Sequence, residues 1–144
     1  MSLDDDLNSI ANVDASDFNL AADSLVTRWG AAGISPEVAL DPVLRFFERY
    51  PNIDYGMPGT LAHFIEQVQG ATYDQQIIAS VGRSPTMMTV TLLNRLINGT
   101  TAGADRKPLI SCLRLARSKL QNDPALLKWV EELLIRISEI HPGE

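Results

Sequence analysis

Few side chains in this 144-residue sequence have the chemistry of a catalytic or metal site. There is one cysteine, Cys112, and there are two histidines, His63 and His141. His63 stands three residues before Glu66, a spacing that brings two metal-ligand types to one face of a helix. Di-iron bundles use Glu-x-x-His twice with two further glutamates, whereas this sequence has one pair in the reverse order. We therefore interpret His63 and Glu66 as a surface pair, and we predict no metal or other cofactor.

Cys112 is the only thiol that could act as a nucleophile. It lies in a run with Leu109, Ile110 and Leu113, which is typical of a small core residue. Arg114, two residues further on, would not face it on a helix and so could not activate it. The sequence also lacks a glycine-rich phosphate loop. Because no nucleophile and base, no ligand cluster and no phosphate cradle come together, we predict that the protein is not an enzyme.

The acidic residues are concentrated in the first third of the chain. The net charge is −6, and residues 1–54 alone contain ten acidic and three basic residues, which gives −7. Residues 55–104 are neutral and residues 105–144 carry +1. An acidic surface repels phosphate, which disfavours direct nucleic-acid binding, and it attracts a basic protein. The alternative interpretation is that the charge only keeps the protein in solution.

Helix boundaries are marked by a capping residue followed by proline at Ser35-Pro36, Asp41-Pro42, Ser84-Pro85 and Asp123-Pro124. Gly70 and Gly99 follow apolar runs as stop signals. No stretch alternates as a strand does. We predict about seven helices, with a break in the second at Asp41-Pro42 left open: roughly 17–31, 36–50, 59–69, 73–82, 85–98, 106–120 and 124–140.

These helices predict an all-α fold. The helix over 85–98 has the widest apolar arc, with Leu92, Leu93, Leu96 and Ile97, so we expect it to lie in the core. Short linkers make neighbouring helices antiparallel, which favours stacked hairpins in an irregular armadillo- or HEAT-like arrangement. A closed helical bundle is the alternative. We expect residues 1–15 to be a flexible N-terminal segment and residues 16–141 to form a single helical domain.

No apolar stretch approaches the roughly 20 residues of a membrane-spanning helix, so we expect no membrane association. The first ten residues carry Asp4, Asp5 and Asp6 without any lysine or arginine, unlike an export signal. These two features lead us to expect a cytoplasmic location.

Two segments are similar to a known family. Residues 55–66 have the sequence Tyr-Gly-Met-Pro-Gly-Thr-Leu-Ala-His-Phe-Ile-Glu, and Arg83-Ser84-Pro85-Thr86 is followed by Thr-Leu-Leu-Asn-Arg-Leu-Ile-Asn-Gly at residues 91–99. Over roughly residues 54–120 this pattern resembles small helical immunity proteins of bacterial polymorphic and contact-dependent growth-inhibition toxin systems. The resemblance implies an inhibitor that binds one cognate toxin domain, often a nuclease. The alternative function is a generic helical scaffold or adaptor of the bacterial cytoplasm.

The family pattern carries over no toxin-contact residue, so candidates come from surface chemistry. A toxin that acts on nucleic acid needs a basic cleft, which carboxylates would cover. The first candidate set joins five acids and one tyrosine, a residue enriched at binding hot spots: Asp41, Glu48, Asp54, Tyr55, Glu66 and Asp74. The second set shares the polar side of the helix over 85–98, where a structural role is the alternative: Thr91, Asn94, Arg95 and Asn98.

The absence of a ligand set predicts a protein without bound metal. Elemental analysis of the purified protein should find no stoichiometric zinc, iron or manganese. Treatment with a chelator should leave the Tm unchanged, because removal of a structural metal lowers it. A Tm that falls on chelation and recovers with added zinc would contradict this expectation.

Overall fold

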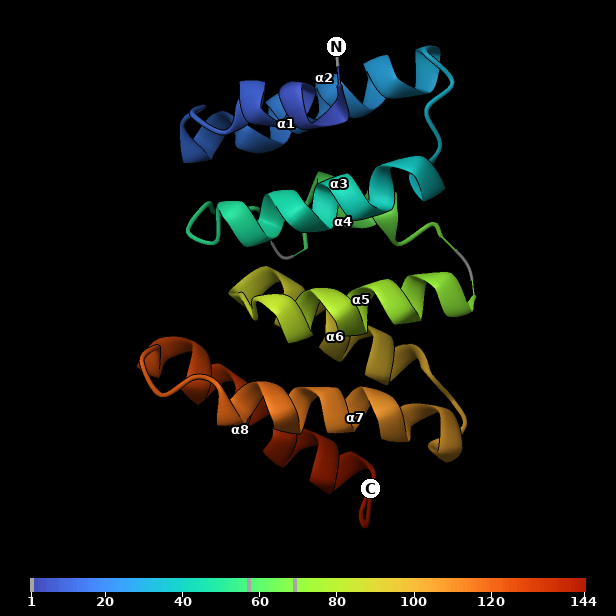
Figure 1. Ribbon diagram of the computed structural model, residues 1–144, viewed down its shortest axis with the longest axis vertical. Helices are drawn as coiled ribbons and strands as arrows, with labels where there is room; N and C mark the ends of the chain where they lie inside the picture. Colours follow the sequence, from blue (N-terminus) through green and yellow to red (C-terminus); the bar gives the residue numbers. More distant parts are fainter. Residues whose placement is uncertain (1, 57, 69) are drawn as a thin grey trace. The chain divides into compact units, whose positions relative to one another are not determined.

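The computed structural model describes residues 2–56, 58–68 and 70–144. Within these ranges all regular structure is helical, which confirms the all-α fold class. The helices, labelled in Figure 1, are α1 (Leu3–Ile10), the short 3₁₀ helix η1 (Ala15–Asp17), α2 (Phe18–Ala31), α3 (Pro36–Arg49), α4 (Thr60–Ile65), α5 (Ala71–Arg83), α6 (Met87–Gly99), α7 (Gly103–Ser118) and α8 (Pro124–Ile140). Met57 of the family-like segment and Gln69 of the predicted helix 59–69 lie outside the described residues.

The chain folds into two compact units, and the prediction of a single helical domain over residues 16–141 stays a prediction. The first unit comprises residues 1–76 and the second residues 77–144, so the boundary falls inside α5. Domain boundaries are usually recognised by a flexible, polar linker between elements. Here the boundary lies within a helix, and the sequence has no such linker to show it.

In the first unit two helical hairpins stack on each other. α1 packs against α2 and α3 packs against α4, while α1 also contacts α3 and α2 contacts α4 (Figure 1). Part of the segment 1–15, which we expected to be flexible, forms α1, and this helix buries Leu7 and Ile10. Ser2 and Asp5 form a capping box at its start, and the Trp29 indole N–H donates to Asp6 Oδ2 at 3.0 Å.

α3 continues through Asp41-Pro42 without a break. Ser35 caps the helix by accepting a hydrogen bond from the Val38 N–H at 3.3 Å. Pro42 removes one hydrogen bond from the ladder. The helix is retained because the residues on both sides of the proline, from Ala39 to Phe47, present one continuous buried face.

The loop between α3 and α4 folds around Tyr55, which is only 4% exposed. Its ring meets Phe18, Phe46 and Phe47 edge-on, with centroids 5.3, 6.1 and 4.7 Å away. Edge-to-face contacts of this kind stabilise aromatic pairs beyond the area they bury. The Tyr55 hydroxyl donates to the Tyr50 carbonyl oxygen at 2.5 Å, so the polar end of the side chain is satisfied inside the core.

Two glycines let the loop close over Tyr55. Gly56 and Gly59 have φ of +84° and +88°, values that L side chains rarely adopt. A Cβ at Gly59 would lie 1.8 Å from the Tyr55 carbonyl oxygen. Asn19 of α2 holds the other side of the loop, because its Oδ1 accepts the Thr60 N–H at 3.3 Å. The Tyr-Gly-x-Pro-Gly sequence is therefore a folding motif here.

In the second unit α6, α7 and α8 pack against one another (Figure 1). α8 has the predicted bounds, and Asp123 caps it by accepting the Leu126 N–H at 3.2 Å. α6 begins after Thr86, whose side chain forms a capping box with Thr89, rather than at Ser84-Pro85. The predicted core of α6 is buried except for Leu96, which is half-buried; the fully buried residues of that set are Leu92, Leu93 and Ile97.

The contact at Gly59 predicts a large loss of stability when a side chain is added there. Gly59→Ala should lower the free energy of unfolding by more than about 2 kcal/mol, because both the positive φ and the Tyr55 carbonyl oppose a Cβ. Gly30→Ala is the matched control, since α2 leaves open space at Gly30 and alanine favours helices by up to about 1 kcal/mol. Urea unfolding of both variants measures the difference, and equal effects would contradict the role assigned to Gly59.

Candidate functional site

The division into two units also separates the charges. Residues 1–76 contain twelve acidic and three basic residues, which gives −9, whereas residues 77–144 contain six acidic and nine basic residues, which gives +3. The sequence count by thirds concealed this contrast, because its limits did not match the structural boundary. The first unit is therefore the part of the chain suited to a basic partner.

The exposed face of α3 carries the first two candidates of the acidic set. Asp41 is more than half exposed, and its Oδ1 lies 3.4 Å from Arg45 Nε one turn further along. Glu48 is half-buried on the same side of the helix. Arg49 is the other base on this face, and its guanidinium donates to Asn8 Oδ1 at 3.3 Å. An exposed ion pair such as Asp41–Arg45 is weak, so Asp41 remains able to pair with a partner's cation.

The other three acids follow α3 along the chain. Asp54 is exposed in the loop, where its Oδ1 accepts the Gly56 N–H at 3.1 Å. Glu66 is half-buried at the end of α4. Asp74 is half-buried in the first turn of α5, the end of a helix where negative charge is favoured. All five acids of the set belong to the first unit and none of them is fully buried.

His63 and Glu66 form the surface pair that the sequence predicted. The His63 side chain is well exposed, and its Nδ1 lies 3.7 Å from Glu66 Oε1. Among the described residues no three His, Cys, Asp or Glu side chains come close enough to hold a metal ion.

Tyr55 does not belong to the surface set, which corrects the prediction that it anchors a partner. The aromatic cluster of the loop encloses it, and burial raises the pKa of its hydroxyl well above the ordinary value. The signal that could have placed it inside is the glycine pair at 56 and 59, since two such residues bend the chain back over its own backbone.

The first candidate set left out the acids that precede Asp41. α1 presents Asp4 and Asp5 to solvent, while Asp6 is tied to Trp29. Asp23 is exposed on α2, where its Oδ1 accepts the Thr60 hydroxyl. Further exposed acids of the first unit are Asp14, Asp17 and Glu37. Together with Asp41 and Asp54 they make up what we call the acidic surface.

The second candidate set lies on α6 in the second unit, and Thr91 must be removed from it because this residue is buried. Thr91 is only 8% exposed, and its hydroxyl donates to the Met87 carbonyl oxygen at 2.7 Å, which is a structural contact. Asn94 is half-buried, and Arg95 and Asn98 are exposed on the same side of the helix. This set therefore consists of three polar residues on a unit of net positive charge.

The second unit also has a shallow apolar groove of about 240 Å³ between the end of α5 and α7. Cys112 lines it, and burial raises the pKa of this thiol, which favours the unreactive thiol over the thiolate. Leu115 is 57% exposed at the rim. Lys119 closes one end, where its Nζ donates to the Gly82 carbonyl oxygen at 3.2 Å.

Comparison of the chain with models of protein families, with curated proteins and with solved structures found no match. Of the helices in the described ranges, none combines the length and apolarity that crossing a bilayer requires.

Proposed function

We propose that this protein is a non-enzymatic inhibitor, an immunity protein that neutralises a cognate bacterial toxin domain through the acidic surface of its first unit. The observation that carries the proposal is the net charge of −9 on residues 1–76 against +3 on residues 77–144. A toxin that acts on nucleic acid presents a basic cleft to phosphate. Opposite charge on the inhibitor speeds the encounter and sets the orientation of binding.

The residues that resemble the immunity-protein family support this proposal because they have structural roles. Tyr55, Gly56 and Gly59 close the loop after α3, so their role is to hold the scaffold and not to contact a toxin. Separate residues for the scaffold and for toxin contact suit a family of inhibitors, because the scaffold can stay the same while the exposed residues match different toxins. The place of action would be the bacterial cytoplasm, where the inhibitor meets the toxin.

A helical adaptor is the second candidate, and the apolar groove of the second unit favours it. Recognition of a helix uses apolar anchors at several successive turns. A groove of about 240 Å³ holds only one or two side chains, and it lies below the roughly 300–1,000 Å³ usual for ligand pockets. The inhibitor is thus the better supported function. An inhibitor gene would also lie beside a toxin gene, which an adaptor gene need not do.

The decisive experiment uses the toxin domain encoded by the neighbouring gene. Asp41→Lys and Asp54→Asn should each slow association and flatten its dependence on salt, because both remove attraction from the acidic surface. Asp54→Asn keeps a side-chain oxygen for the Gly56 N–H, so the loop should remain closed. Stopped-flow measurements at two salt concentrations test this, and Glu131→Lys on the exposed side of α8 is the control for charge alone.

Two results would argue against the proposal at different levels. If the acidic-surface variants bind normally while Arg95→Glu weakens binding, the toxin contacts α6 and the assigned surface is wrong. If the wild-type protein neither binds the neighbouring toxin domain nor restores growth when both are expressed, the inhibitor function itself is wrong.

A further inference from the structure

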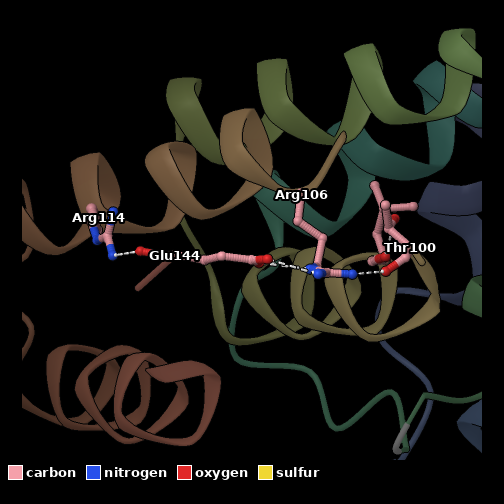
Figure 2. Close-up of polar contacts among 5 residues, drawn as sticks. Thr100, Arg106, Arg114 and Glu144 are labelled. Carbon is pink, nitrogen blue, oxygen red and sulfur yellow. Dashed lines mark hydrogen bonds and ion pairs between the residues drawn. The ribbon is translucent and has the colours of Figure 1, made fainter. Parts of the chain in front are cut away.

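The second unit holds a buried arginine that donates two of its hydrogen bonds to one glutamate. Arg106, in the first turn of α7, is 7% exposed. Its Nε and Nη2 donate to the two carboxylate oxygens of Glu144, each at 2.8 Å, and its Nη1 donates to the Thr100 carbonyl oxygen at 2.7 Å (Figure 2). Two parallel N–H···O bonds match the planar guanidinium to a carboxylate and to few other groups.

Other residues of α7 complete the surroundings of this glutamate. Arg114 donates to the main-chain oxygen of Glu144 (Figure 2). Lys107, Arg114 and Glu144 line a hollow of about 240 Å³. The hydrogen bond from Arg106 holds the pKa of Glu144 below its ordinary value. The site is therefore polar, cationic and shaped around an ionised carboxylate.

Gly103 leaves the space that the carboxylate occupies. A Cβ at this position would lie 2.7 Å from Glu144 Oε1 and 3.5 Å from Arg106 Nη2. Gly103 is the first residue of α7, where alanine would serve the helix at least as well as glycine. Glycine at this position therefore leaves room for the carboxylate, which would have to shift if a Cβ were added.

Glu144 itself lies outside the helical core. α8 ends at Ile140, and the following residues form a turn in which the Glu144 N–H donates to the His141 carbonyl oxygen at 3.2 Å. Pro142 and Gly143 of this turn are exposed, whereas Arg106 is buried and is paired with Glu144. A desolvated cation without its partner is costly, so removal of Glu144 leaves a strong preference for another carboxylate.

We propose that the Thr100 carbonyl, Gly103, Arg106 and Arg114 form a glutamate-binding site, which the chain fills with its own Glu144. The same site accepts the glutamate side chain of an acidic peptide segment when Glu144 is displaced. The site is on the second unit and is independent of the acidic surface and of the proposed toxin.

The test uses the full chain with Glu144→Ala and two blocked dipeptides, acetyl-Gly-Glu-amide and acetyl-Gly-Gln-amide. Both ends of each probe are blocked, so the glutamate side chain is the only carboxylate. The readout is the Arg106 Nε–H signal in ¹H–¹⁵N spectra. It should move in the Glu144→Ala variant and return toward its wild-type position when the glutamate probe is added. The glutamine probe should bind at least about tenfold more weakly, as should the glutamate probe to wild-type protein, whose site is already occupied.

Two further variants separate a binding site from a structural ion pair. Gly103→Ala in the Glu144→Ala background should weaken probe binding without lowering the Tm, because the new Cβ would lie 2.7 Å from the position of the carboxylate oxygen and force it to shift. Arg117→Gln, on α7 but not among the Glu144 contacts, should leave binding unchanged. The proposal is overturned if the Glu144→Ala protein does not prefer the glutamate probe, or if Gly103→Ala leaves that preference intact.

Discussion

The burial of Tyr55 is the interaction on which the first unit depends. Its ring joins Phe18 of α2 to Phe46 and Phe47 of α3, and its hydroxyl bonds to the Tyr50 carbonyl before the chain turns toward α4. Burying a tyrosine hydroxyl costs free energy unless the O–H has a hydrogen-bond partner. The close approach of Gly59 to the Tyr55 backbone then fixes where α4 begins. Through this loop Tyr55 connects α2 of one helical hairpin to α3 and α4 of the other.

Regular helices with marked ends could be predicted from the sequence. α8 has the predicted bounds because Asp123-Pro124 caps it and its apolar stripe continues to Ile137. α2 and α7 have no side-chain cap and were found to within three residues at each end. α1 was missed, although Leu3, Leu7 and Ile10 have helical spacing, because a short acidic segment has little helix stability of its own. It forms because Leu7 and Ile10 are buried against the rest of the first unit.

Only part of the candidate surface could be predicted from the sequence, because the burial of some residues depends on tertiary contacts. The exposure of Asp41 follows from its position opposite the apolar face of α3, which periodicity reveals. The burial of Tyr55 and Thr91 depends on contacts that spacing within one helix or loop does not specify. The contrast of charge between the units was hidden as well, because their boundary lies inside α5.

The two units use charge in opposite ways. In the first unit the excess carboxylates lie at the surface, where they cost little in water and would attract a basic partner. In the second unit Arg106 is desolvated and is compensated within the chain by Glu144. The first arrangement favours rapid association and the second favours selective recognition of one group. Both are consistent with a protein that works by binding.

Hydrogen exchange of the complex tests the central claim most directly, because it locates the partner without any substitution. If a cognate toxin domain is bound as we propose, amides of α1, α3 and the loop over residues 50–56 should exchange more slowly than in the free protein. Those of α6 to α8 should be unchanged. Protection confined to residues 77–144, with the first unit exchanging as before, would contradict the assignment of the acidic surface as the binding site.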